Sequence, residues 1–235
     1  MLGEPELVIT SRQSHALVWR SAAPLRTIAT SVLGGGLGER AWVVNAEVGL
    51  DYADPDPAAH VAALADELVL GGPGVGLLTA ARVREVCAGE DAGVRCHATV
   101  GLSVPTWAAA DDGAWSEWVP GTINLVCWVP APLCDAALVN AVVTVTEAKA
   151  QALFEAGVPG TGTASDAVVV CCPPGGTEPY GGPRSTWGAR LARAAHAVVA
   201  TGTARYLAAG LAPLEVGGKG ARPATPGAPN VGEGA

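Results

Sequence analysis

Apolar and polar positions follow two periods along the chain, and each period predicts one type of element. Short runs rich in Val, Ile, Thr and Trp are typical of strands, and apolar residues recurring every three or four positions indicate helices. The predicted strands cover residues 15–19, 40–48, 93–103, 122–129 and 166–172. One predicted helix begins after Asp54 or Asp56, either of which can cap it, and the others cover residues 79–87, 135–157 and 185–209.

Strands and helices interleave irregularly. This order favours an α/β or α+β fold with one mixed sheet flanked by helices, and it leaves the strand order open. No interior stretch has the composition of a linker, so we predict one domain over residues 1–212. Residues 213–235 are rich in Gly and Pro and carry too little apolar surface to offset the entropy of ordering. We expect them to form a disordered tail.

The composition of the chain argues against several classes of partner and location. The 14 basic and 22 acidic residues give a net charge of −8, which argues against nucleic acid as a partner. No segment is long and apolar enough for a membrane span, and the N-terminus carries acids where a secretory signal carries bases, so we expect a cytoplasmic protein. The six cysteines and four histidines show no metal-ligand spacing, so we expect no metal site and interpret the cysteines as buried thiols. Oligomeric state stays open.

The predicted helix over residues 135–157 carries a polar stripe. Asn140, Thr144, Glu147 and Gln151 recur at steps of four, three and four, which places them on one face. Lys149 lies on the opposite, valine-rich side, although Arg replaces Lys nearly everywhere else in the chain. Either this ammonium extends from the core edge into water, or a carboxylate holds it in a catalytic site.

A glycine-rich loop follows that helix. Gly160 and Gly162 alternate with Thr161 and Thr163, and Ser165 and Asp166 precede the last predicted strand. Such a loop can present N–H groups and hydroxyls to an anion or a developing oxyanion, or it can be a plain turn. Its helix–loop–strand order differs from that of a dinucleotide-binding fingerprint.

A second polar position lies inside a predicted strand. Asn45 is surrounded by apolar residues, and a buried amide needs hydrogen-bond partners. It therefore belongs either to a satisfied core network or to a polar site.

The tryptophans of residues 107–118 either contact a flat macrocycle or cover the core.

Several segments together resemble a known family. NAEVGLDYADPDP, GVGLLTAARV, ATVGLSVPTWAA, PGTINLVCWVPAPL, LVNAVVTVTEAKAQAL and GTGTASDAVVV occur in this order over roughly residues 30–195. They are similar to segments of the adenosylcobinamide amidohydrolase family of corrinoid salvage. The resemblance implies hydrolysis of the amide between the aminopropanol arm and the corrin ring, giving adenosylcobyric acid and 1-amino-2-propanol for cobalamin synthesis. It implies a small-molecule corrinoid substrate and no cofactor, since the cobalt belongs to that substrate.

Residue roles are our own inference. Amide hydrolysis needs an activated nucleophile, oxyanion donors and a proton for the amine. We take Glu147 as the candidate base, Lys149 as the group that stabilises charge or protonates the amine, and Asp166 as the alternative acid or base. The opposite positions of Glu147 and Lys149 on the helix argue against both acting on one bond. Candidate substrate-binding residues are Asn45, Thr122, Asn124, Gly160, Thr161, Gly162, Thr163 and Ser165.

Two questions stay open at this stage. The nucleophile is either a carboxylate-activated water or a hydroxyl of the loop. The alternative function is that of a noncatalytic corrinoid-binding protein, in which the same loops hold the macrocycle without cleaving it.

Overall fold

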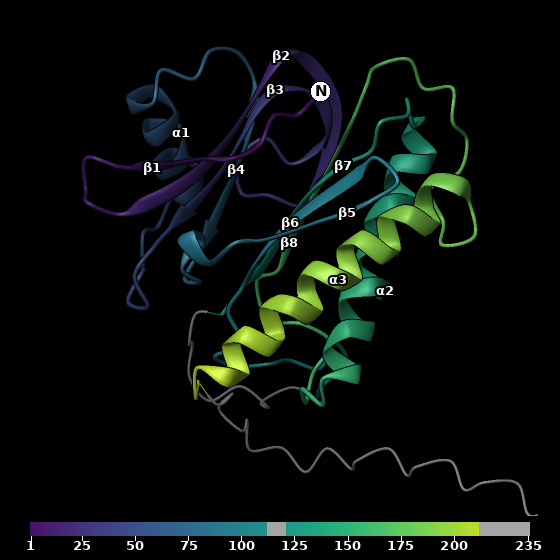
Figure 1. Ribbon diagram of the computed structural model, residues 1–235. Coiled ribbons are helices and arrows are strands. Elements are labelled where there is room, and N and C mark those ends of the chain that lie inside the picture. Colours follow the sequence, from purple (N-terminus) through teal and green to yellow (C-terminus); the bar gives the residue numbers. More distant parts are fainter. Residues whose placement is uncertain (112–120, 212–235) are drawn as a thin grey trace, which may run out of the picture.

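The computed structural model describes residues 1–111 and 121–211, and these form one sheet with helices on both sides (Figure 1). The sheet has eight strands, in the order β4-β3-β2-β8-β7-β6-β5, and β1 pairs with β2 outside this path. β3–β4 and β7–β8 are parallel and the other pairs antiparallel, which confirms the predicted mixed sheet. The strands are β1 (Glu6–Ile9), β2 (His15–Ala29), β3 (Gly36–Glu47), β4 (Gly74–Thr79), β5 (Cys87–Asp91), β6 (Val94–Val100), β7 (Ile123–Trp128) and β8 (Ala167–Cys172).

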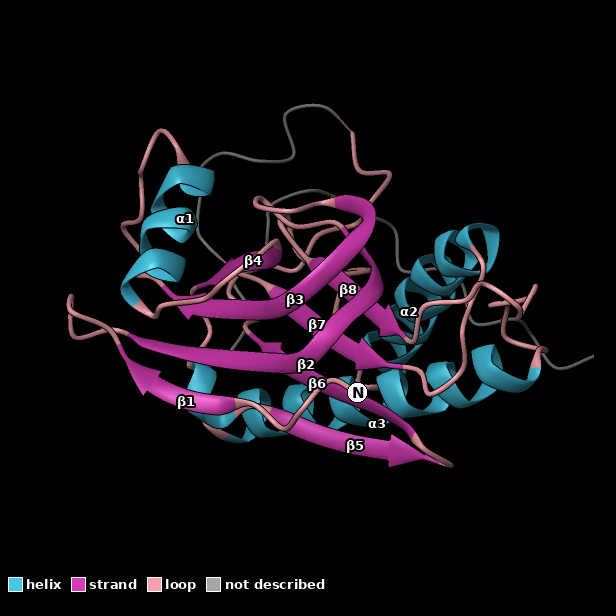
Figure 2. Ribbon diagram, turned by 90° about the horizontal axis from the view of Figure 1, so that it is seen from above, coloured by secondary structure: helices cyan, strands magenta, loops and turns pink. Residues whose placement is uncertain are grey.

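Three α-helices flank the sheet, namely α1 (Pro57–Glu67), α2 (Asp135–Glu155) and α3 (Thr186–Ala208). The Asp56 carboxylate accepts a hydrogen bond from the Ala59 N–H at 2.9 Å, so the predicted cap begins α1. α2 and α3 pack against each other and against β5–β8, whereas α1 packs on β4 (Figure 2). No helix in residues 1–111 and 121–211 is long and apolar enough to cross a membrane.

The sheet curls until its two halves face each other. β3 and β7 are separated by β2 and β8 in the sheet, yet the Asn124 amide of β7 donates directly to the Asn45 side chain of β3. Three apolar clusters follow from this geometry: one between α1 and the outer face of β2–β3, one between the two halves of the sheet, and one between β5–β8 and α2–α3. The middle layer therefore brings residues of the first 80 positions against residues beyond position 95.

The predicted helix over residues 79–87 is wrong. β4 ends at Thr79, a single 3-10 turn covers Val83–Glu85, and β5 begins at Cys87. The apolar residues at helical spacing in this segment do not form a helix, because the chain enters a β-hairpin that begins at Cys87. Ala92 and Gly93 both have positive φ and form the turn that joins β5 to β6.

The strand β4 was not predicted, because its glycines resemble a loop. A side chain at Gly76 would overlap Val61 of α1, and one at Gly74 would overlap the Trp42 ring. These glycines therefore admit close neighbours within a strand. Two other expectations, the disordered tail and the placement of Trp115 and Trp118, lie outside the described residues.

Candidate active site

A cavity of about 180 Å³ opens where β4 ends and where β7 and β8 begin. Its polar side chains are hydroxyls only, and none of the described residues that line it carries a charge. The hydroxyls belong to Thr30, Ser31, Tyr52, Thr79, Thr122 and Ser165, and the apolar lining to Val32, Val48, Pro57, Leu77, Leu78, Ala80 and Ala167. Such a lining suits a neutral ligand with hydrogen-bonding groups.

Two of these hydroxyls meet across the cavity wall. Thr79 is the last residue of β4, Thr122 directly precedes β7, and their Oγ1 atoms lie 2.5 Å apart. The Ala81 N–H donates to Thr79 Oγ1 at 3.0 Å. Thr79 and Thr122 are 1% and 6% exposed, so the pair is shielded from bulk water.

A network of amides lies between the halves of the sheet beside this pair. Asn124 Nδ2 donates to Asn45 Oδ1 and to the Leu78 carbonyl, both at 2.9 Å, and Asn45 Nδ2 donates to Thr99 Oγ1 at 3.0 Å. Both asparagines are 1% exposed. Both Asn45 Nδ2 and Asn45 Oδ1 thus have partners in a core network, while Asn124 Oδ1 has no hydrogen-bond partner among the described residues.

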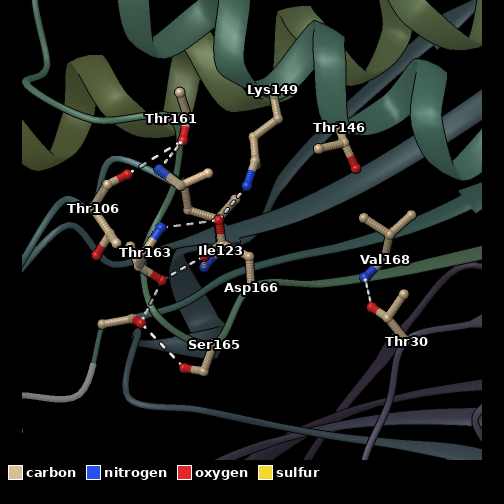
Figure 3. A network of polar contacts seen from close by, with 12 residues as sticks. Thr30, Thr106, Ile123, Thr146, Lys149, Thr161, Thr163, Ser165, Asp166 and Val168 are labelled. Carbon is tan, nitrogen blue, oxygen red and sulfur yellow. Dashed lines mark hydrogen bonds and ion pairs between the residues drawn. The ribbon is translucent and has the colours of Figure 1, made fainter. Parts of the chain in front are cut away.

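A buried ion pair lies next to the cavity, on the α2 side. Lys149 extends from α2 and donates to Asp166 Oδ2, and the two side chains are only 8% and 11% exposed (Figure 3). The Asp166 carboxylate also accepts the N–H groups of Ile123 at 2.8 Å and of Thr163 at 3.1 Å. Asp166 therefore ties α2, the start of β7 and its own loop together.

The loop of residues 160–166 uses most of its polar groups within the protein. Thr161 N–H donates to the Thr106 carbonyl at 2.9 Å, and Thr163 N–H is already bound to Asp166. A side chain at Gly160 or Gly162 would overlap a neighbour: Thr106 in the first case, Asp166 and Lys149 in the second. Of this loop only Ser165 lines the cavity, so an oxyanion-binding role for the other residues stays a prediction.

Glu147 lies in a different place. It is exposed and lines a second cavity of about 260 Å³ between α2 and α3, with Gln151, Arg193 and His196. At ~100° per residue it lies about 200° around the helix from Lys149. The structure pairs Lys149 with the Asp166 carboxylate, which was one of the two alternatives for this lysine, and leaves Glu147 apart from them.

Four of the six hydroxyl residues that line the cavity were missed by the sequence reasoning, namely Thr30, Ser31, Tyr52 and Thr79. Thr79 follows the residues GVGLL. If that segment is taken as a strand, alternate residues share a face, and Thr79 then lies on the inward face with Leu77. Tyr52 stacks on His60 with ring centroids 5.5 Å apart, and its hydroxyl lies 3.0 Å from His60 Nδ1. Burial and the nearby Asp54 carboxylate raise the pKa of Tyr52, which keeps the phenol neutral beside the cavity.

Comparison with known proteins gives the family of the chain. The model of the family described as "Adenosylcobinamide amidohydrolase" matches residues 3–210. A protein of that name from Halobacterium salinarum is 48% identical over 103 residues, which cover 41% of this chain and 44% of that protein. A second protein of the same name from Methanosarcina mazei is 29% identical over 172 residues, which cover 69% of this chain and 82% of that protein.

These findings first define a class, that of hydrolases acting on an amide bond. The match spans most of the described chain, including both halves of the curled sheet and the ion pair. The chain belongs to the adenosylcobinamide amidohydrolase family.

Proposed function

We propose that the protein hydrolyses the amide that joins the aminopropanol arm to the corrin ring of adenosylcobinamide. The products would be adenosylcobyric acid and 1-amino-2-propanol, and the acid would re-enter cobalamin synthesis. The observation that carries the proposal is an uncharged, largely apolar cavity with six hydroxyl side chains in its lining, beside the Lys149–Asp166 pair. The arm ends in an amide and an alcohol, which are neutral and can hydrogen-bond to hydroxyls.

The size of the cavity decides which part of the substrate enters it. Drug-sized ligands occupy ~300–1,000 Å³, and a corrin with its adenosyl group is larger still. A cavity of about 180 Å³ is suited to one side arm. We therefore place the arm inside and the macrocycle outside, over the mouth of the cavity.

The reaction adds water to the carbonyl carbon. A C–O bond forms, the C–N bond breaks, and the leaving nitrogen takes up a proton. Neither Lys149 nor Asp166 lines the cavity, so we assign them a positioning role. Asp166 directly follows Ser165, and it accepts a hydrogen bond from the N–H of Ile123, which directly follows Thr122. The pair thereby fixes two hydroxyls of the cavity wall.

Incubation of the purified chain with adenosylcobinamide tests the proposal. Chromatography of the corrinoids and an amine assay should show adenosylcobyric acid and 1-amino-2-propanol in equal amounts, with none in a sample without protein. Retention of intact adenosylcobinamide by the protein, without release of the amine, would instead identify a corrinoid carrier.

Replacing Glu147 by Gln distinguishes the structural account from the role assigned by sequence. Glu147 is exposed and faces the cavity between α2 and α3, so we expect kcat/KM to change less than tenfold, or under ~1.4 kcal/mol of barrier. Steady-state release of aminopropanol measures this change. A larger loss in kcat at unchanged KM would return Glu147 to the chemical step.

A further inference from the structure

We propose that the Thr79–Thr122 pair supplies the hydrogen-bond donor for the carbonyl oxygen of the scissile amide, with Thr122 as the donor and Thr79 as its positioning residue. This inference rests on the proposed function. It concerns the oxygen on which negative charge develops when water adds to the amide carbon, and for which a donor is therefore required.

Counting protons leads to this assignment. Two hydroxyls carry two protons, and the 2.5 Å separation of their oxygens accommodates one proton between them. Thr79 Oγ1 already accepts the Ala81 N–H. Neither hydroxyl has another acceptor among the described residues, so one O–H of the pair is left to donate to a ligand.

Exposure selects Thr122, since either hydroxyl of the pair could be the donor to the other. Thr122 is the more exposed of the two, at 6% against 1%, and both residues line the cavity. In the assigned arrangement the Ala81 N–H donates to Thr79, the Thr79 hydroxyl donates to Thr122, and the Thr122 O–H is left for the ligand. Each bond in such a chain polarises the next one, which strengthens the final donor.

The apolar surroundings of the pair increase the stabilisation that the Thr122 hydroxyl gives to the oxyanion. The pair bridges the facing halves of the sheet, next to buried apolar residues such as Leu77. A fixed donor in a site with little water stabilises a developing oxyanion more than an exposed hydroxyl does, since it does not have to reorient during the reaction.

The experiment compares Thr122→Val with Thr122→Ser. Valine keeps the shape of threonine and removes the hydroxyl, so kcat should fall ~10²- to 10³-fold with a much smaller change in KM. Serine keeps the hydroxyl and should retain kcat within about tenfold of wild type. Thr79→Val should lower kcat to an intermediate extent, because Thr122 keeps its hydroxyl and loses only its orientation.

Thr27→Val is the matched control. Thr27 is 1% exposed, lies on β2 and does not line the cavity, so its variant should keep wild-type kcat while reporting the cost of a Thr→Val change in the core. Thermal unfolding of each variant shows whether it folds. If Thr122→Val is unfolded, the test is made with Thr122→Ser. A loss of kcat in Thr122→Ser as large as the loss in Thr79→Val overturns the proposal.

Other results separate this inference from the proposed function. An active wild type together with a Thr122→Val variant within threefold of it overturns the donor assignment alone. A wild type that releases no aminopropanol overturns the proposed function and the inference with it.

Discussion

Replacing Asp166 by Asn is expected to lower the free energy of unfolding by ~3–5 kcal/mol, the usual cost of leaving one charge of a buried pair without its partner. Lys149 Nζ has no other hydrogen-bond partner among the described residues, and its side chain is 8% exposed. The new amide would also direct its N–H₂ group either at the Lys149 ammonium and the Thr163 N–H or at the Ile123 N–H, so that a donor faces a donor in both orientations.

The reverse change should cost less. In Lys149→Met the Asp166 carboxylate keeps the two N–H donors and the nearby Thr163 hydroxyl, 2.5 Å from Oδ1. Arg193→Gln is the control, because its pair with Asp91 lies at the surface with the arginine side chain 60% exposed. That variant should show the smallest change of the three.

Urea unfolding followed by circular dichroism measures this ranking. The expected order of destabilisation is Asp166→Asn, then Lys149→Met, then Arg193→Gln. Equal effects of Asp166→Asn and Arg193→Gln would mean that the pair is open to water and does not fix the cavity wall.

Replacing Gly162 by Ala is expected to reduce turnover more than tenfold and to destabilise the fold by ~1–3 kcal/mol, as overpacking does. The added methyl group would overlap the Asp166 carboxylate and the Lys149 ammonium, and moving the carboxylate would disturb its hydrogen bonds to the N–H groups of Ile123 and Thr163. Displacement of Asp166 shifts the neighbouring Ser165 and Ile123, and with them the hydroxyls of the cavity.

Gly71→Ala provides the matched control for this prediction. No atom lies within 4 Å of a methyl group placed there, so the variant should keep wild-type activity and stability. Aminopropanol release and urea unfolding, measured on both variants, give the comparison. Equal behaviour of the two variants would show that the loop adapts freely and that Gly162 is not required for close packing.

Part of the site could be predicted from local sequence signals. The isolated Lys149 among valines left two alternatives open, an ammonium in water or one held by a carboxylate, and the structure shows the second, with Asp166 as the partner. The helix predicted over residues 135–157 corresponds to α2, which ends at Glu155. It could be predicted because its apolar spacing and the acidic residue in its first turn are local signals. The strands around Asn45 and Asn124 were also found from their β-branched residues.

The curl of the sheet could not be predicted, because it depends on contacts between distant positions. Asn45 and Asn124 are 79 positions apart, and no local pattern records their hydrogen bond. Thr79 and Thr122 meet for the same reason, 43 positions apart. The glycines of β4 further hid a strand, since their role is to admit Val61 and Trp42.

The position of the substrate arm tests the central claim most directly. The measurement is a crystal structure of the protein bound to a cobinamide analogue in which a CH₂ group replaces the scissile amide nitrogen, so that the carbonyl stays and hydrolysis is blocked. We expect the arm in the cavity between β4 and β7, with the carbonyl oxygen within hydrogen-bond distance of Thr122 Oγ1. An arm bound in the second cavity, between α2 and α3 and beside Glu147 and His196, would contradict the account.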